Sequence, residues 1–370
     1  MPRGYKKAKT AGAARPARQF RFDESLALFQ YMLSLFGCQT LDTVCEGMKD
    51  ETWEGWDEQN ISRYYYFLTT RLFEYPGITK EQLLRYDQNI TSHTMAISGR
   101  RGAFRWKYFQ YMALLFSEIY LDKYFNDPQG LLDGLNAQAT LLNSEREAVD
   151  SLPPYVLDDL NKVAFWQATG SGKTLIMHVN ILQYRHYLEK AGKHTTLNRV
   201  ILLTPNEGLS EQHNGEFKLS SMPADIFNKE SGSLYAGQEI SIIDIHKLKE
   251  EGKEKTVSVD AFESNNLVLV DEGHRGAGGE EGLVAVVLGQ EGYPSEGVWR
   301  VRDVNQKAEA YRFGGAPQDN NHTRIIDLAL SIAQSYDQKS WLSTYPSSAQ
   351  PIDGKEPEHF ALIPMISQVQ

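Results

Sequence analysis

The sequence predicts an α/β fold with a parallel sheet and flanking helices, preceded by a mainly helical N-terminal region. From about residue 160, short β-branched runs alternate with helix-like stretches, which is typical of a parallel sheet with crossover helices. Between residues 22 and about 155, apolar residues recur at helical spacing with little strand-like alternation. The chain has 370 residues and 41% hydrophobic content, enough for two or three domains.

Three segments carry the prediction of N-terminal helices. Asp23 is expected to cap a helix over 26–36, and a second helix is expected over 61–73. The third helix covers 106–125, where apolar residues form a wide stripe. Asn126-Asp127-Pro128 is expected to end it, because the residue before a proline avoids helical conformation.

Four apolar runs are predicted as strands of the sheet. Each is apolar along its length, as expected when helices cover both faces of a sheet. After about Gly282 the pattern weakens, and only 325–333 resembles a helix there. The predicted strands are 163–166, 200–203, 240–245 and 267–270.

Charge and cysteine content limit the class of protein. The first 21 residues carry seven Lys and Arg residues and no acid, and are expected to be disordered. This tail either binds phosphates non-specifically or is an inert solvated terminus. Because the net charge is −10, a nucleic-acid site must be a local basic patch. Two cysteines and the lack of a long apolar run indicate a cytoplasmic protein with no membrane segment.

A glycine-rich loop stands between the first predicted strand and the helix that follows it, which is the context a phosphate-binding loop requires. Its small residues let backbone N–H groups converge on the phosphates of ATP, while Lys173 neutralises phosphate charge. The Thr174 hydroxyl is expected to hold Mg²⁺. Gln167 stands where the general pattern has a glycine. The residues expected to bind the nucleotide here are Ala168, Thr169, Gly170, Ser171, Gly172, Lys173 and Thr174.

Two adjacent carboxylates, Asp271 and Glu272, follow the apolar run 267–270. Taken alone, such a pair usually means a solvated strand end. Together with the phosphate loop, the pair predicts that Asp271 binds Mg²⁺ and that Glu272 accepts a proton from the water that attacks the γ-phosphate. Lys173, Asp271 and Glu272 are therefore the predicted catalytic residues.

The segments 168–174 and 271–274 resemble motifs I and II of superfamily 2 helicases, with Asp-Glu-Gly-His in place of the usual DEAD or DEAH box. The run from about 100 to 282 most resembles the motor subunit of type III restriction enzymes and related phage-defence helicases. The resemblance implies a RecA-like fold and an ATP-dependent DNA helicase or translocase. It also implies that His274 couples ATP hydrolysis to movement on nucleic acid.

Two further matches to the family each keep an alternative. Thr204-Pro205-Asn206 resembles motif Ia, which contacts the nucleic-acid backbone, although a proline that simply ends a strand explains it about equally well. Gln110 matches the family glutamine that reads adenine, or is a surface glutamine on a helix.

Basic and aromatic residues alternate just before the third predicted helix. This mixture either stacks bases and binds phosphates or is a basic helix start packed by aromatic rings. The residues are Arg100, Arg101, Phe104, Arg105, Trp106, Lys107 and Tyr108.

These observations divide the chain into a basic tail (1–21), a helical region (22–155), a RecA-like ATP-binding lobe (156–298) and a poorly defined, aberrant or truncated segment (299–370). No second lobe with its arginine motif follows. The chain is therefore expected to be a fragment, a truncated product or one part of a split enzyme.

Two functional hypotheses follow. The first is the ATPase lobe of a DNA helicase or translocase from a restriction or defence system, using ATP and Mg²⁺. Its expected partners are DNA and a subunit that supplies the second lobe or modifies DNA. The second is a catalytically silent module that binds nucleotide or a partner chain. A nuclease rests on analogy alone, since no nuclease cluster of carboxylates and lysine is visible.

Overall fold

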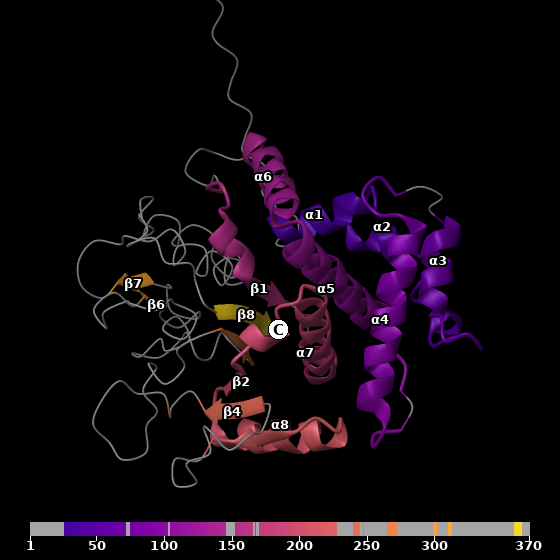
Figure 1. Ribbon diagram of the computed structural model, residues 1–370. Helices are drawn as coiled ribbons and strands as arrows, with labels where there is room; N and C mark the ends of the chain where they lie inside the picture. The colour runs from indigo at the N-terminus through magenta and orange to yellow at the C-terminus, as the bar shows by residue number, and fades with distance from the viewer. Residues whose placement is uncertain are drawn as a thin grey trace, which may run out of the picture.

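The computed structural model combines a helical N-terminal region with a parallel α/β sheet, which confirms the predicted fold class (Figure 1). It describes residues 26–71, 75–102, 104–145, 152–165, 167, 170–227, 240–244, 247, 265–271, 299–301, 310–312 and 359–364. None of the helices within these ranges is long and apolar enough to cross a membrane.

The N-terminal region is built from α-helices and short 3₁₀ turns, and its two longest helices, α4 and α5, lie against each other and against the later helix α7. Its elements are α1 (Ala27–Leu35), α2 (Leu41–Cys45), η2 (Glu51–Trp53), α3 (Arg63–Arg71), α4 (Lys80–Ser98), α5 (Tyr108–Asn126), α6 (Pro128–Ser144) and η4 (Leu157–Asn161).

Helix starts differ from the prediction by a few residues, for local reasons. Leu26, rather than Asp23, precedes the first turn of α1. Helix α5 begins at Tyr108 instead of residue 106, because the Trp106 ring is buried and its Nε1–H donates to Thr94 Oγ1 at 2.8 Å. The predicted stop after α5 is confirmed, since Asp127 ends α5 and also caps α6 by accepting the Gly130 N–H at 3.0 Å.

The sheet contains six described strands, all parallel, in the order β1-β8-β5-β2-β4-β3. The four predicted strands are present, and no end differs from its predicted position by more than one residue. The strands are β1 (Lys162–Phe165), β2 (Arg199–Thr204), β3 (Ala224–Ile226), β4 (Ile240–Asp244), β5 (Asn266–Val270) and β8 (His359–Pro364). The other elements are α7 (Lys173–Lys190), η5 (His194–Thr196), α8 (Glu207–Leu219) and an antiparallel pair, β6 (Trp299–Val301) and β7 (Ala310–Arg312).

Strand β8 lies between β1 and β5, in the interior of the sheet. The sequence had set residues 299–370 apart from the lobe, and strand β8 belongs to that segment. Its backbone pairs with Lys162–Phe165 on one side and with Asn266–Leu269 on the other. The apolar stretch Phe-Ala-Leu-Ile within β8 has the composition of a buried parallel strand but lacks a flanking helical pattern that would have marked it.

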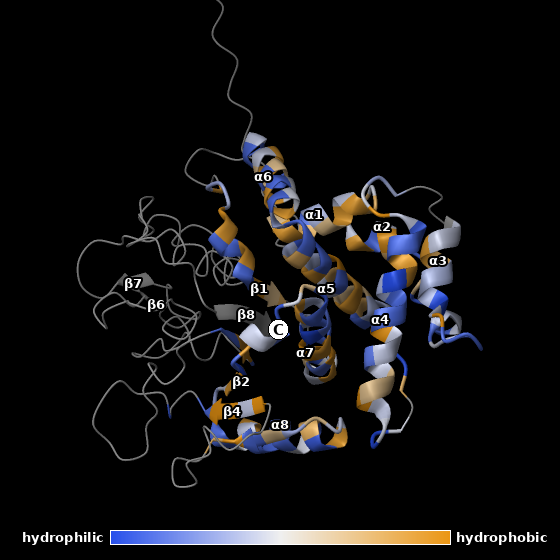
Figure 2. Cartoon of the chain, in the orientation of Figure 1, coloured by the Kyte–Doolittle hydropathy of each residue, from blue (hydrophilic) through white to orange (hydrophobic). Residues whose placement is uncertain are grey.

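Helix α7 lies between the sheet and the N-terminal helices (Figure 1). Six consecutive residues, 176–181, are buried, which is typical of a helix enclosed on all sides rather than one with a solvent face. Figure 2 shows that α8, by contrast, alternates hydrophobic and hydrophilic residues, whereas β4 is mostly hydrophobic. One hydrophobic core runs from α1 through α5 and α7 to the strands.

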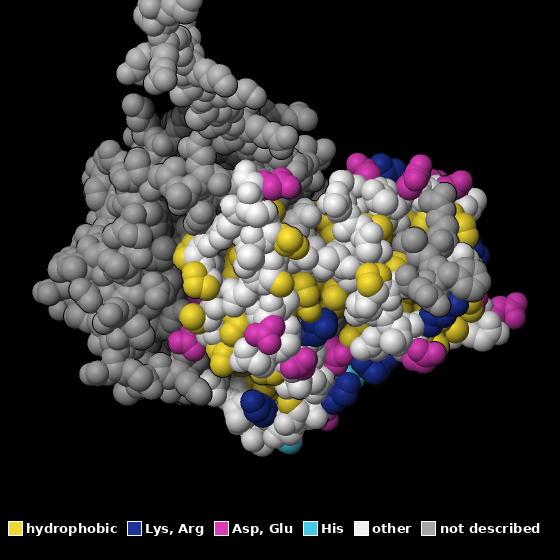
Figure 3. All heavy atoms as spheres, turned by 90° about the horizontal axis from the view of Figure 1, so that it is seen from above, with side chains coloured by type: hydrophobic (Ala, Val, Ile, Leu, Met, Phe, Trp, Pro, Cys, Tyr) yellow, Lys and Arg dark blue, Asp and Glu magenta, His cyan; other side chains and the backbone are white. Residues whose placement is uncertain are grey.

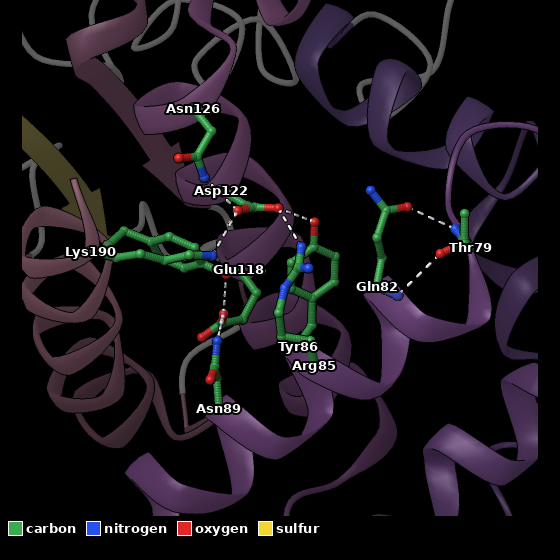
Figure 4. Close-up of polar contacts among 10 residues, drawn as sticks. Thr79, Gln82, Arg85, Tyr86, Asn89, Glu118, Asp122, Asn126 and Lys190 are labelled. Atoms are coloured by element: carbon green, nitrogen blue, oxygen red, sulfur yellow. Dashed lines mark hydrogen bonds and ion pairs between the residues drawn. The ribbon is translucent and has the colours of Figure 1, made fainter.

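Polar contacts also join α7 to the N-terminal helices, and they converge on Asp122 of α5 (Figure 4). Its carboxylate accepts from Tyr86 Oη at 2.6 Å and from Arg85 Nη2 at 3.0 Å, both on α4. Lys190, at the end of α7, lies 3.7 Å from the other carboxylate oxygen. The consecutive helices α4 and α5 and the later helix α7 therefore meet at one carboxylate, which favours one relative position of the three.

Glu118, one turn before Asp122, is fully buried in the same interface. Its Oε2 accepts from Tyr187 Oη at 2.7 Å and from Asn89 Nδ2 at 3.0 Å, whereas its Oε1 is buried with no hydrogen-bond partner among the described residues. Burial raises the pKa of Glu118 to about 7 from 4.5, and hydrogen bonding to the carboxylate offsets only part of this effect.

The replacement Glu118→Gln is expected to stabilise the protein at pH 8 and to have little effect at pH 4.5. The carboxyl group binds its proton more tightly in the folded state, so its contribution to stability is complete below the unfolded pKa and is lost as pH rises through about 7. The expected gain in free energy of unfolding at pH 8 is about 1–3 kcal/mol, measured by urea denaturation. The exposed Glu58→Gln is the control, and an equal gain at both pH values would contradict this account.

Candidate nucleotide-binding site

The glycine-rich loop connects β1 to α7, as the sequence predicts. Gly170 and Gly172 have φ values of 75° and 86°, a left-handed backbone conformation that residues other than glycine rarely adopt. Gly172 is the N-cap of α7 and provides no side-chain hydrogen bond to the first turn, which begins at Lys173. A helix N-terminus of this kind presents backbone N–H groups and the positive end of the helix dipole, as a phosphate site requires.

Gln110 touches this loop from the N-terminal region. Its Nε2 donates to the Ser171 carbonyl at 2.6 Å, and its Oε1 accepts the Lys107 N–H at 2.8 Å. A Cβ atom at Gly172 would lie 2.5 Å from the same Nε2, so a larger residue there would displace the end of the Gln110 side chain from the loop. The side chain is half-buried, and both its amide nitrogen and its amide oxygen are bonded to backbone groups. Neither of the two alternatives from the sequence predicted this contact.

The register of the parallel strands brings Asp271 and the phosphate loop to one edge of the sheet. Phe165, two residues before the loop opens at Gln167, pairs with Pro364, and Leu269 pairs with Leu362. Asp271 is therefore level with Phe165 on the opposite side of β8. With neighbouring strands about 4.8 Å apart, the two strand ends are separated by about 10 Å.

Asp271 is itself held firmly at this edge. Its N–H continues the pairing of β5 with β2 by donating to the Leu203 carbonyl at 2.9 Å. Its carboxylate Oδ2 lies 2.8 Å from His213 Nε2, which comes from α8. The side chains of both residues are buried, so the contact is shielded from water.

No motif in the sequence predicted this role for His213 or the cluster behind it. His178, on α7, is fully buried, stacks on Phe217 at a centroid distance of 4.2 Å and contacts Ser220 Oγ through Nδ1 at 2.8 Å. Burial, together with the nearby His213 and Arg101, lowers the pKa of His178 well below its usual range, so this ring is neutral. The available signal was the helical spacing of 210, 213, 217 and 220, which predicts one buried face.

The predicted basic and aromatic cluster before α5 is largely bonded within the protein. Arg101 pairs with Glu216 Oε2 at 2.6 Å, and it also donates to the Glu216 carbonyl and to Ser220 Oγ. Lys107 pairs with Glu54 at 2.8 Å and with Glu51 at 3.3 Å. These contacts favour the structural alternative for the cluster. On the molecular face drawn in Figure 3, basic and acidic side chains are interspersed.

Thr204, Pro205 and Asn206 stand at the end of β2, level with the same sheet edge. Thr204 is buried and its Oγ1 lies 2.6 Å from Ser210 Oγ. Asn206 Oδ1 accepts the Leu209 N–H at 2.9 Å and so caps α8. Both side chains therefore have internal partners, and a contact with nucleic acid at this loop stays a prediction.

Four predicted site residues lie outside the described part of the chain. Ala168 and Thr169 belong to the phosphate loop, and Glu272 and His274 follow Asp271. Their roles rest on the sequence alone.

A phosphate loop and a strand-end aspartate at one edge of a parallel sheet define the class of P-loop nucleotide-binding motors. Residues 135–314 match the family described as type III restriction enzyme, res subunit. The match implies a helicase-like motor module in this part of the chain. No curated protein matches the chain significantly.

The replacement Gln110→Met is expected to loosen the phosphate loop. It removes the donor to the Ser171 carbonyl but keeps a side chain of similar length, and a single hydrogen bond contributes about 0.5–1.5 kcal/mol. Amide exchange in a peptide covering 167–176 should become about 2- to 10-fold faster, as measured by mass spectrometry. Gln88→Met, at an exposed position of α4, is the control. Unchanged exchange in the loop would show that the Gln110 contact does not restrain it.

The replacement Arg101→Met is expected to lower the free energy of unfolding by about 2–4 kcal/mol, because it leaves Glu216 and the end of α8 without their partner in a largely buried position. The exposed neighbour Arg100 offers a matched control, since Arg100→Met should change the free energy of unfolding by less than about 0.5 kcal/mol. Equal effects of the two replacements in urea denaturation would argue against a structural role for Arg101.

Proposed function

We propose that this chain is the ATP-binding and ATP-hydrolysing lobe of a DNA helicase or translocase of a restriction or phage-defence system. The observation that carries the proposal is the placement of the phosphate loop and Asp271 at one edge of the sheet, on either side of β8. The family match over residues 135–314 supports the motor class. The restriction or defence setting and the preference for DNA are part of the proposal.

The phosphates of ATP are proposed to bind at the N-terminus of α7. The N–H groups of its first turn and the left-handed glycines of the loop supply donors, and Lys173 supplies positive charge. Gln110 holds the loop through Ser171 and so keeps these donors in place. In this arrangement, Gln110 acts on the nucleotide site from the N-terminal helices.

Mg²⁺ is proposed to be held by the Thr174 hydroxyl and the Asp271 carboxylate. These are hard oxygen donors of the kind that Mg²⁺ prefers, and a hydrogen bond to His213 already orients the carboxylate, so the residues fit the ion. When bound, Mg²⁺ offsets the negative charge of the β- and γ-phosphates. Glu272 is proposed to accept the proton of the attacking water, and His274 to couple hydrolysis to movement on DNA.

DNA is the proposed track, and a further chain or segment is the proposed source of a second lobe. Motors of this type use an arginine that reaches the γ-phosphate across the cleft, which accelerates hydrolysis by about 10³–10⁵-fold. Hydrolysis by residues 1–370 alone should therefore be slow. A modification subunit is the alternative partner.

Lys173→Ala is expected to abolish Mg²⁺-dependent ATP binding, because the replacement removes the charge that balances the phosphates. Glu272→Gln should keep binding but lower the turnover rate by about 10²–10⁴-fold, as expected for loss of a general base. Fluorescent-nucleotide titration and a steady-state ATPase assay measure the two effects. Lys193→Ala, at an exposed position after α7, is the control. Equal nucleotide affinity in wild type and Lys173→Ala would refute the proposed site.

The same ATPase assay with single- and double-stranded DNA separates a motor from a silent module. Stimulation of turnover by either DNA supports the motor, and the form that stimulates more identifies the track. Nucleotide binding with no turnover, with or without DNA, would overturn the catalytic part of the proposal.

A further inference from the structure

Helix α8 turns one buried face toward α7 and the sheet edge. Ser210, His213, Phe217 and Ser220 recur at helical spacing and are all buried, whereas the neighbouring Glu211 and Gln212 are exposed. A buried face of two serines and a histidine is unusual for packing alone, because each polar group needs a partner. The partners of these groups therefore indicate what the face does.

His213 is the member of this face that contacts the nucleotide site. Its Nε2 lies 2.8 Å from Asp271 Oδ2, and only 4% of its side chain is exposed. Because a carboxylate is an acceptor, Nε2 carries the hydrogen of this bond. The contact engages one oxygen of Asp271, and no residue in the described part of the chain hydrogen-bonds to the other.

Both ends of α8 are anchored, so His213 cannot readily move away from Asp271. Asn206 caps the N-terminal end, and Arg101 binds Glu216 and Ser220 at the C-terminal end. His178 on the phosphate-loop helix meets the same Ser220 Oγ at 2.8 Å. The position of His213 is thus set by the N-terminal region and by α7 together.

We propose that His213 is a positioning residue that orients the Asp271 carboxylate toward the magnesium ion of bound ATP. The inference rests on the proposed function, since it assigns Asp271 to the metal. Partners of this kind fix the geometry of a ligating carboxylate, and their loss typically weakens metal affinity or activity by about 10–100-fold. His213 itself touches neither the metal nor the nucleotide.

A matched pair of replacements tests the donor alone. Glutamine at 213 places its amide nitrogen the same number of bonds from the backbone as Nε2, whereas methionine has a similar length and no donor. Affinity for a fluorescent ATP analogue is measured across free Mg²⁺ concentrations and in EDTA, with thermal unfolding as the check on folding. Asp271→Asn and Lys173→Ala are included as reference variants.

His213→Met should raise by about 10–100-fold the Mg²⁺ concentration at which the increase in affinity for the ATP analogue is half complete. The affinity for the analogue in EDTA should stay unchanged. His213→Gln should stay close to wild type. If His213→Met does not fold, His213→Asn, whose shorter amide does not reach Asp271, should show the same loss of Mg²⁺ dependence.

The outcomes separate this inference from the proposed function. A wild-type Mg²⁺ dependence in the methionine or asparagine variant, with a shift in Asp271→Asn, would overturn the role of His213 alone. An equal shift in Mg²⁺ dependence in His213→Gln and His213→Met would overturn it as well, because the hydrogen-bond donor at position 213 would then be irrelevant. No shift in Asp271→Asn and no loss of binding in Lys173→Ala would overturn both.

Discussion

The parallel register of β1, β8 and β5 is the constraint on which the rest of the site depends. Parallel strands end at a common edge, so the loop after β1 and the carboxylate after β5 are brought together only if the strand between them pairs in the correct register with both. A shift of one residue in β5 would turn Asp271 to the other face of the sheet. The hydrogen bond from Asp271 N–H to Leu203 extends the ladder by one residue and opposes such a shift.

A second dependence runs through α7. This helix starts in the phosphate loop and ends beside Asp122, so the contacts that bind it to α4 and α5 also set the direction from which Lys173 approaches the sheet edge. Glu118 and Gln183 join the same interface through Tyr187 and the Leu114 carbonyl. Burial of charged and polar groups there is costly unless each is bonded, which favours one relative position of the helices.

The fold class, the central strands and the phosphate loop were predictable from the sequence because each carries a local pattern: apolar β-branched runs and glycines in a fixed order. The predicted helix starts were less accurate. At α5 this is because the Trp106 side chain bonds to Thr94 on another helix. Strand β8 was not predicted, because its place in the sheet depends on the strands β1 and β5, which lie far away in the chain. Contacts such as those between Gln110 and Ser171 or between His213 and Asp271 join separate elements, and no local pattern records them.

The enclosure of α7 has a practical consequence for dividing the protein. A polypeptide starting at residue 156 would keep the phosphate loop and Asp271 but would lose Gln110. It would also lose the helices that cover Tyr184, which packs on Phe125, and Tyr187, which bonds to Glu118. The newly exposed side chains of Tyr184 and Tyr187 would favour self-association in water. The smallest piece that remains monodisperse should therefore begin well upstream of the recognisable motor sequence.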